Sequence, residues 1–359
     1  MKEYIPHNLP TIFDEEITEV ENLLSNLVLT LGSKVREFEK AFEKYISLPS
    51  AAVNSGTSAL HLALEVLGVR ENAKVLIPSY TCVTVVLPIL YQKAIPFLVD
   101  IDTDFNISLE EVERYLTKDI KAVIVPHMFG YPADIKPIKE VCEEKGVYLI
   151  EDCAQSLGAE YEGKKVGTLG DISIFSFYAT KMITSIQGGM VCSKDKELIE
   201  EIKELTDVEG DPKDDRIKFR YTMSDINAAV GITQLKRIDS FIKRRRKISK
   251  IYREILEDTD IILPEESKNK KHVYHRFVVR TKFDPELIKI KLYKNGIATA
   301  RMHYPPLYRR ELLRRYCKRS FPKTDEIAES SISLPIYPSL SDEKAIYIAS
   351  TVKKTLKEL

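Results

Sequence analysis

Asp152 and Lys181 are the two residues whose types and positions could support covalent chemistry. Asp152 follows the apolar run 147–150, and a carboxylate at the end of a buried strand is poorly solvated, so it needs a cationic partner such as a protonated pyridine nitrogen. Lys181 lies after a second strand-like run, where low solvation would favour the neutral amine that forms an imine with an aldehyde. The pair therefore predicts a binding site for pyridoxal phosphate.

Two further segments could hold the phosphate group of such a cofactor. At residues 53–58 a strand-like run ends and a helical pattern begins, so the free amides and the dipole of the first helical turn would face outward. Gly56 allows close backbone approach, and the hydroxyls of Thr57 and Ser58 can donate to phosphate oxygens. Ser176 ends the strand-like run before the lysine and would be delivered toward the same phosphate.

None of these motifs is decisive alone. Ser and Thr begin many helices as ordinary N-caps, a metal ligand or a helix cap would explain Asp152, and most lysines that follow strands lie on the surface. The order of the phosphate turn, the carboxylate and the lysine along one chain favours the cofactor site over these alternatives.

The elements that must position these residues follow an alternating pattern. Apolar strand-like runs alternate with amphipathic helical stretches, which is typical of an α/β fold with a largely parallel sheet. From about Ser224 a long helical register begins and continues into the basic stretch 236–250. The basic run 243–247 interrupts an apolar periodicity, which indicates a solvated helix face rather than a nucleic-acid patch. The seven strand-like runs are 51–53, 74–77, 96–99, 122–125, 147–150, 172–175 and 189–192.

Length and composition set the domain organisation and exclude several functions. The 359 residues exceed the roughly 250 to 300 that one core supports. We expect a large α/β domain over 1–235 and a smaller α+β domain over 236–359, with residues 1–30 able to pack on the small domain. Lys plus Arg and Asp plus Glu both number 54, so the net charge is zero and no global basic field favours nucleic acid or anionic lipid.

Cysteine usage and hydropathy indicate a cytoplasmic protein. The five cysteines are far apart and odd in number, so neither a disulfide framework nor a metal site is expected. The residues at the start of the chain form no apolar signal core. No apolar run approaches the length of a membrane span.

With these motifs in order, the chain resembles the DegT/StrS-type sugar aminotransferases, which are pyridoxal phosphate enzymes of the aspartate aminotransferase fold, called fold type I. The resemblance covers nearly the full length and implies a large, mainly parallel seven-stranded domain with a smaller C-terminal domain. Besides the three motifs it is carried by residues 32–39, 125–130, 223–229, 303–305 and 333–338.

The resemblance also implies roles for particular residues. In the family the lysine, here Lys181, forms the imine with the cofactor and shuttles protons, while Gln155 would lie at the ring hydroxyl. The overall reaction moves an amino group, usually from glutamate, to a keto carbon of a nucleotide-linked sugar through pyridoxamine phosphate. A homodimer with shared active sites is implied. By position, the phosphate would be held by Gly56, Thr57 and Ser176, the ring nitrogen by Asp152, and the sugar by His303 and Tyr304.

The chain departs from the family pattern at three places, one of which is Gln187, where the family commonly has glutamate. Cys82 occupies the place where the family usually has an aromatic ring that stacks on the cofactor, and Tyr80 is the nearest residue that could supply a ring. Arg220 lies where the dimer-crossing segment commonly has an asparagine, so it could contact the phosphate bound by the partner subunit.

Two other functions stay open on the same fold. A nucleotide-sugar dehydratase is one, although such relatives typically replace the imine lysine with histidine, unlike Lys181 here. A non-catalytic regulator that binds the cofactor or a sugar nucleotide is the other. Fold resemblance alone does not separate these three functions, because function depends on the site.

Overall fold

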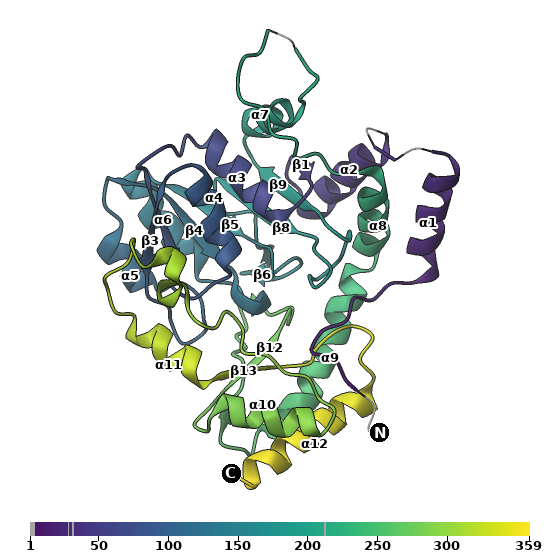
Figure 1. The fold of residues 1–359 in the computed structure, drawn as a ribbon, viewed down its shortest axis with the longest axis vertical. Helices are drawn as coiled ribbons and strands as arrows, with labels where there is room; N and C mark the ends of the chain where they lie inside the picture. Colours follow the sequence, from purple (N-terminus) through teal and green to yellow (C-terminus); the bar gives the residue numbers. More distant parts are fainter. Residues whose placement is uncertain (1–3, 28, 31, 212) are drawn as a thin grey trace.

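A seven-stranded sheet forms the centre of the computed structural model, which describes residues 4–27, 29–30, 32–211 and 213–359 (Figure 1). Its strand order is β1-β9-β8-β5-β4-β2-β3. Strand β9 pairs antiparallel with both β1 and β8, and the other pairs in the sheet are parallel. The strands are β1 (Ser50–Val53), β2 (Lys74–Pro78), β3 (Ile95–Val99), β4 (Ile120–Pro126), β5 (Tyr148–Asp152), β8 (Ile172–Ser176) and β9 (Gly189–Ser193).

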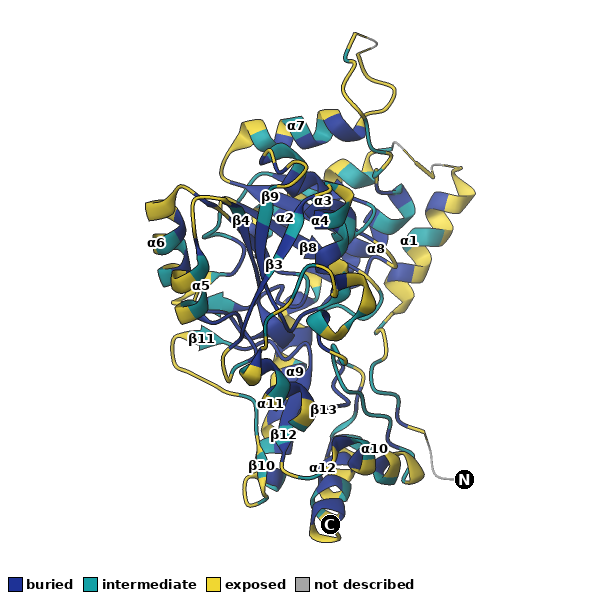
Figure 2. Ribbon diagram, turned by 60° about the vertical axis from the view of Figure 1, so that its left-hand side comes forward, coloured by how far each residue is buried: buried dark blue, intermediate teal, exposed yellow. Residues whose placement is uncertain are grey.

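Each of the seven expected runs falls on one of these strands, so the predicted mainly parallel sheet is confirmed. The strands read as continuous apolar runs because both faces of the sheet are covered. Along β4, Val123 and Val125 belong to one core cluster while Ala122 and Ile124 belong to another on the opposite face. Figure 2 shows buried residues gathered in the sheet and exposed residues on the outer sides of the surrounding helices.

Helices from different parts of the chain cover the two faces. One face carries buried side chains from α2 (Lys34–Ile46), α5 (Leu109–Tyr115), α6 (Ile135–Lys145) and α8 (Asp225–Lys236). The other face is covered by α3 (Gly56–Val66), α4 (Val86–Tyr91) and α7 (Lys196–Thr206). Leu307, Leu313 and Phe321, far along the chain, also pack on this second face.

A separate core cluster lies toward the C-terminus. It is built on the three-stranded sheet β10-β12-β13 and the helices around it, and Ile5 is part of it. Helix α1 (Asp14–Ser25) instead contacts α8. The division of the chain at residue 235 stays a prediction. The elements are α9 (Ile238–Leu256), β10 (Ile261–Ile262), β12 (Phe277–Thr281), α10 (Pro285–Lys294), α11 (Pro322–Ser330), β13 (Ser331–Leu334) and α12 (Asp342–Lys357).

The remaining elements are short. A small sheet joins β6 (Glu160–Tyr161), β7 (Lys164–Lys165) and β11 (Lys270–Lys271). Short 3₁₀ turns lie at Val83–Val85, Met128–Gly130, Leu307–Arg309 and Glu311–Leu313.

The basic run 243–247 lies within α9, and part of it differs from the expected solvated face. Arg245 is only 2% exposed, and its guanidinium donates to the carbonyls of Tyr274, His275 and Ile336. Lys247 forms an ion pair with Asp342. The run therefore links α9 to neighbouring segments as well as facing solvent. The positive charge of the run in the sequence does not indicate this structural role.

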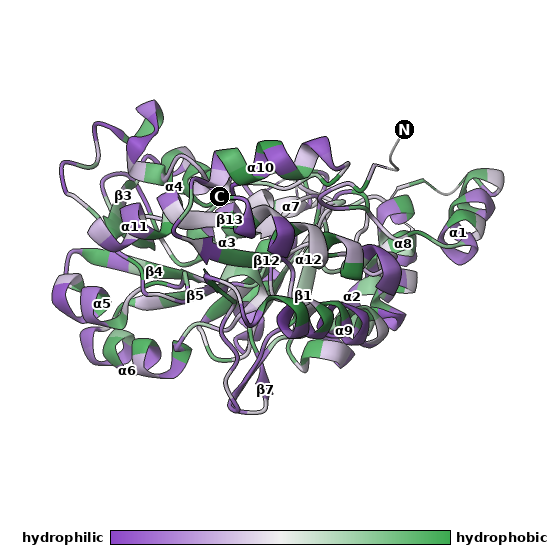
Figure 3. Ribbon diagram, turned by 90° about the horizontal axis from the view of Figure 1, so that it is seen from below, coloured by the Kyte–Doolittle hydropathy of each residue, from purple (hydrophilic) through white to green (hydrophobic). Residues whose placement is uncertain are grey.

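Hydrophilic and hydrophobic residues are interleaved on the outer helices, as Figure 3 shows for α5, α6 and α10. Among the described residues, no helix is both long enough and apolar enough to pass through a lipid bilayer. Residues 1–3 of the chain start, where the sequence shows no apolar signal core, lie outside the described residues.

Candidate active site

A cavity of about 430 Å³ lies where β5 and β8 end beside the first turn of α3. Residues that the sequence places far apart meet in its wall. Those nominated from the sequence are Gly56, Thr57, Cys82, Asp152, Gln155, Ser176, Lys181 and His303. Arg220 and Tyr304 are not among its lining residues.

Asp152 and Lys181 face this cavity with opposite charges, and the protein shifts the pKa of each toward its neutral form. Burial raises the pKa of Asp152, although a hydrogen bond from the Ala154 N–H to Oδ1 at 2.9 Å and the charge of Lys181 act in the other direction. Burial lowers the pKa of the Lys181 amine, against the attraction of Asp152. The site thus favours a neutral amine and leaves the carboxylate in need of a cation.

The phosphate end of the cavity is set by the start of α3. Ser55 caps the helix and accepts a hydrogen bond from the Ser58 N–H at 3.0 Å. A side chain at Gly56 would place its Cβ only 2.7 Å from Cβ of Ser176, so the helix turn and the end of β8 approach more closely than a larger residue would allow. Gly56 and Thr57, the first two residues of α3, both line the cavity, so the start of the helix faces it as an anion site requires.

Ser58 is a correction to the sequence interpretation. Its hydroxyl donates to Oδ1 of Asn54 at 2.6 Å, and the residue is not part of the cavity wall. It stabilises the turn, whereas Thr57 lines the cavity. The ordinary N-cap interpretation of this motif is therefore right for Ser55 and Ser58, and it coexists with an exposed helix start.

The suggestion that Tyr80 supplies a stacking ring is wrong. Tyr80 is fully buried, its hydroxyl donates to the Met302 carbonyl at 2.7 Å, and it does not line the cavity. The rings in the wall belong to Tyr178, His275 and His303. His303 stacks on Phe129 with centroids 5.7 Å apart and packs edge-on against Tyr80. Cys82 lines the cavity and its sulfur accepts a hydrogen bond from Thr84.

His303 is held uncharged in this wall. Burial lowers its pKa to about 3, and the nearby positive charges of Lys181 and Arg276 add to that shift. A neutral imidazole can donate from one nitrogen and accept at the other. The expected contact between His303 and the substrate stays a prediction, and a neutral ring would make it by hydrogen bonding rather than by charge.

Tyr304 and Arg220 lie elsewhere. The Tyr304 hydroxyl donates to the Glu329 carboxylate, and the Arg301 guanidinium lies 3.5 Å from the centre of its ring. Arg220 is exposed, and its backbone carbonyl accepts a hydrogen bond from Asn54, directly before the α3 turn. After α7 the chain forms a loop that extends away from the body of the molecule in Figure 1. Arg220 lies where the chain has returned to the body, between Phe219 and Tyr221, which pack against the core.

Two residues in the cavity wall, His275 and Arg276, were given no role from the sequence. They directly precede the strand β12. The signal that could have marked them is a pair of basic residues adjoining an apolar strand, but such pairs are common and nothing in the sequence places this one beside Lys181.

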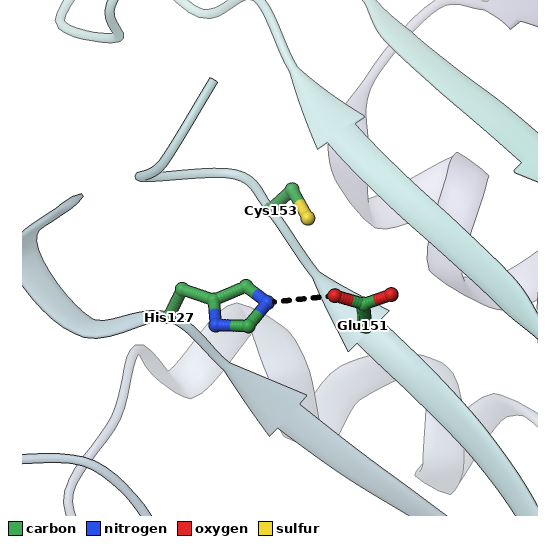
Figure 4. Close-up of side chains that lie close together, drawn as sticks. All are labelled: His127, Glu151 and Cys153. Atoms are coloured by element: carbon green, nitrogen blue, oxygen red, sulfur yellow. Dashed lines mark hydrogen bonds and ion pairs between the residues drawn. The ribbon is translucent and has the colours of Figure 1, made fainter. Parts of the chain in front are cut away.

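His127, Glu151 and Cys153 form a buried cluster (Figure 4), and two of its members, Glu151 and Cys153, are the chain neighbours of Asp152. Three such side chains could hold a metal ion if their lone pairs were free, but hydrogen bonds occupy those of His127 and Glu151. Nδ1 of His127 accepts from the Ala133 N–H, so Nε2 carries the proton and donates to Glu151 at 3.0 Å. The Glu151 carboxylate also accepts three backbone N–H groups, from Gly167, Leu169 and Gly170.

These contacts make the cluster a structural support rather than a metal site. Burial would raise the pKa of Glu151, but the hydrogen bond from His127 and the backbone N–H groups outweigh it and lower the pKa. The backbone N–H of His127 donates to the carbonyl of Asp152 at 3.1 Å. The cluster thus ties the end of β4 to the end of β5 and fixes the backbone that carries Asp152.

Replacing Glu151 with alanine is expected to lower the free energy of unfolding by about 3–5 kcal/mol, since four buried donors would lose their acceptor. Chemical denaturation of the cofactor-free protein would measure it. Glu151→Gln keeps one carbonyl acceptor and should cost less. A Glu151→Ala protein as stable as the wild type would show that water replaces the carboxylate at no cost.

Comparison with known proteins gives the family. The sequence profile of the DegT/DnrJ/EryC1/StrS aminotransferase family matches residues 10–353. The chain belongs to this family. Membership confirms the resemblance inferred from the motifs and, at the level of the family, the expectation of an aminotransferase.

Relatives of this aminotransferase family member align over almost their whole lengths. An uncharacterised protein of Methanocaldococcus jannaschii is 37% identical over 99% of this chain and 98% of its own. GDP-perosamine synthase of Escherichia coli O157:H7 is 34% identical over 98% of both chains. Among solved structures, the PLP form of Spr1654 of Streptococcus pneumoniae, described as a candidate sugar aminotransferase, matches this chain with a TM-score of 0.93. The two are 28% identical, and the match covers 99% of both chains. The fold type I architecture is thereby confirmed.

Proposed function

We propose that the protein is a pyridoxal 5'-phosphate-dependent aminotransferase that moves an amino group from glutamate to a keto carbon of a nucleotide-linked sugar. The observation that carries this proposal is the meeting of Lys181 and Asp152 in one cavity with the open first turn of α3. GDP-perosamine synthase, at 34% identity, supports the choice of acceptor class. The solved PLP and PMP forms of Spr1654 support the choice of cofactor.

The residues present fit this cofactor. Gly56 at the start of α3 and Ser176 at the end of β8 line the same part of the cavity, where a phosphate could meet the helix start, and Thr57 adds a hydroxyl beside them. Asp152, whose pKa is raised by burial, is the carboxylate that a protonated ring nitrogen would satisfy. Gln155 lines the same wall, and its Oε1 accepts from the Phe129 N–H at 3.2 Å, which fixes its orientation.

When bound, the cofactor supplies the aldehyde that carries the amino group and the ring that accepts electron density from the reacting carbon. Lys181 contributes a neutral amine at Nζ, which can attach the cofactor and later hold and deliver a proton. Asp152 orients the ring and stabilises its charge through a carboxylate whose Oδ1 is already fixed by the Ala154 N–H.

A homodimer with shared sites is part of the proposal. Arg220 is exposed and is not in the cavity wall of its own chain. We assign it to the phosphate site of a partner subunit, where a guanidinium would match phosphate oxygens. Size-exclusion chromatography with light scattering would give the oligomeric state.

The first test is an absorbance spectrum of the purified protein with pyridoxal phosphate, before and after glutamate is added. We expect a visible band from the lysine-bound cofactor, which glutamate bleaches toward the pyridoxamine spectrum. GDP- and UDP-linked keto sugars would then be screened by mass spectrometry for an amino product. Release of a deoxy keto sugar without an amino product would identify a dehydratase, and binding without turnover would identify a regulator.

A further inference from the structure

Arg276 is a buried guanidinium in the wall of the active-site cavity, and it has few hydrogen-bond partners. It is 6% exposed and lies directly before β12. Its Nη1 reaches the His275 carbonyl only at 3.3 Å, and Nε has no hydrogen-bond partner. Within the part of the chain that the structure describes, no carboxylate forms an ion pair with it. Burying a charge in this state is costly unless something else satisfies it.

A comparison with Arg245 shows that this is not simply how the fold treats buried arginines. Arg245 is still more enclosed and its Nε also has no hydrogen-bond partner, but its Nη1 donates to three backbone carbonyls, at 2.9, 3.2 and 3.4 Å. Arg245 also lies outside the lining of the active-site cavity, whereas Arg276 is part of that lining. Arg276 is thus the buried guanidinium that has both unused donors and access to the cavity.

The charges around Arg276 indicate what it can bind. Burial lowers the pKa of Arg276 to about 10, so the group is still charged at neutral pH. Its charge contributes to the lowered pKa of Lys181 and of His303. The carboxylate in the cavity wall is Asp152, which the proposed function assigns to the cofactor. The cavity therefore holds a positive charge that neither the protein nor the cofactor ring neutralises.

We propose that Arg276 binds the α-carboxylate of the amino-acid donor. This inference rests on the proposed function and adds to it the residue that selects the donor. A guanidinium recognises a carboxylate through two parallel hydrogen bonds, and Arg276 has the free donors for this. Binding would also satisfy the group that the free enzyme leaves buried and unpaired.

Position favours the donor carboxylate over the diphosphate of the sugar nucleotide. In an α-amino acid the carboxylate and the reacting amine share one carbon atom, so a carboxylate anchor must lie close to Lys181. Arg276 meets this condition, because it lines the same cavity as Lys181. The diphosphate of a nucleotide-linked sugar is separated from the keto carbon by part of the sugar ring, and it would be expected farther from the lysine.

The test compares donor binding with nucleotide binding in matched variants. Arg276→Met removes the charge and keeps much of the side-chain volume. Arg276→Lys keeps the charge but cannot form the two parallel hydrogen bonds of a bidentate contact. Arg280→Met is the control, since Arg280 lies a short way further along the chain, within β12, pairs with Glu326 and is outside the active-site cavity. All variants are loaded with pyridoxal phosphate, and those with a wild-type cofactor spectrum are titrated with glutamate in single turnover and with GDP and UDP by calorimetry.

We expect Arg276→Met to raise the glutamate concentration for half-maximal conversion by roughly 10- to 100-fold, with Arg276→Lys between it and the wild type. The affinities for GDP and UDP should stay unchanged, as should every value for Arg280→Met. Conversion of Arg276→Met at wild-type glutamate concentrations would overturn the inference, and so would a loss confined to GDP or UDP. A wild-type spectrum that glutamate leaves unchanged would instead contradict the proposed function.

Calorimetry with 2-oxoglutarate covers the case in which Arg276→Met does not retain the cofactor. The keto acid carries the same carboxylate, and it is titrated into wild type and Arg276→Lys loaded with pyridoxamine phosphate. Weaker binding by Arg276→Lys supports the inference, because the lysine keeps the charge and loses only the paired hydrogen bonds. Equal binding by the two proteins would contradict a bidentate contact.

Discussion

Replacing Lys181 with alanine is expected to lower the turnover rate for amino transfer at least roughly 10⁴-fold. The side chain supplies both the amine that attaches the cofactor and the group that moves the proton, and no other lysine lines the cavity among the described residues. The variant should still bind pyridoxal phosphate, since the α3 turn and Asp152 are unchanged. Stopped-flow absorbance and product mass spectrometry would measure the loss.

The matched control for this prediction separates charge from chemistry. Lys181→Arg keeps a cation beside Asp152 but has no amine that can attach an aldehyde. It should be as inactive as Lys181→Ala, and borohydride reduction should attach the cofactor to the wild type but to neither variant. Because burial lowers the pKa of Lys181, attachment in the wild type should become fast at a pH below the ordinary lysine pKa of 10.5. Normal turnover by either variant would remove Lys181 from the mechanism.

The sheet and the centre of the site could be predicted because both depend on short-range patterns. A parallel strand covered on both faces must be apolar at nearly every position, so runs such as 122–125 stand out in the sequence. In a parallel sheet, the carboxyl ends of neighbouring strands lie at the same edge, so side chains at those ends can be predicted to lie close together from the strand assignment alone. Asp152 on β5 and Ser176 on β8 meet for this reason, since the two strands are paired.

The parts that were missed depend on contacts between distant segments. Arg276 reaches the cavity because the start of β12 packs near the end of β4, where the backbone N–H of Arg276 donates to the Phe129 carbonyl. No periodicity in the sequence indicates that these two segments lie close together. Tyr80 and Cys82 differ by two positions, and only the packing around His303 decides which of them faces the cavity. The burial of Arg245 likewise depends on carbonyls that lie up to 91 residues away.

Replacing Asp152 with asparagine is expected to lower the turnover rate by roughly 10²- to 10⁴-fold, with little change in the overall structure. Asparagine has almost the same shape and can still accept the Ala154 N–H, but it cannot keep a ring nitrogen protonated. The loss should fall on the turnover rate more than on the Michaelis constant for glutamate. Steady-state kinetics at several glutamate concentrations would measure that split.

The stability of the same variant distinguishes a functional role from a structural one. Burial raises the pKa of Asp152 in the folded cofactor-free protein, so its contribution to stability is fully present below the unfolded pKa and is lost as the pH rises through the folded pKa. Asparagine resembles the protonated form, and the cofactor-free variant should therefore be at least as stable as the wild type at neutral pH. A variant that is less stable and equally active would show that Asp152 supports the fold; one that is more stable and nearly inactive would show that its charge is retained for the cofactor.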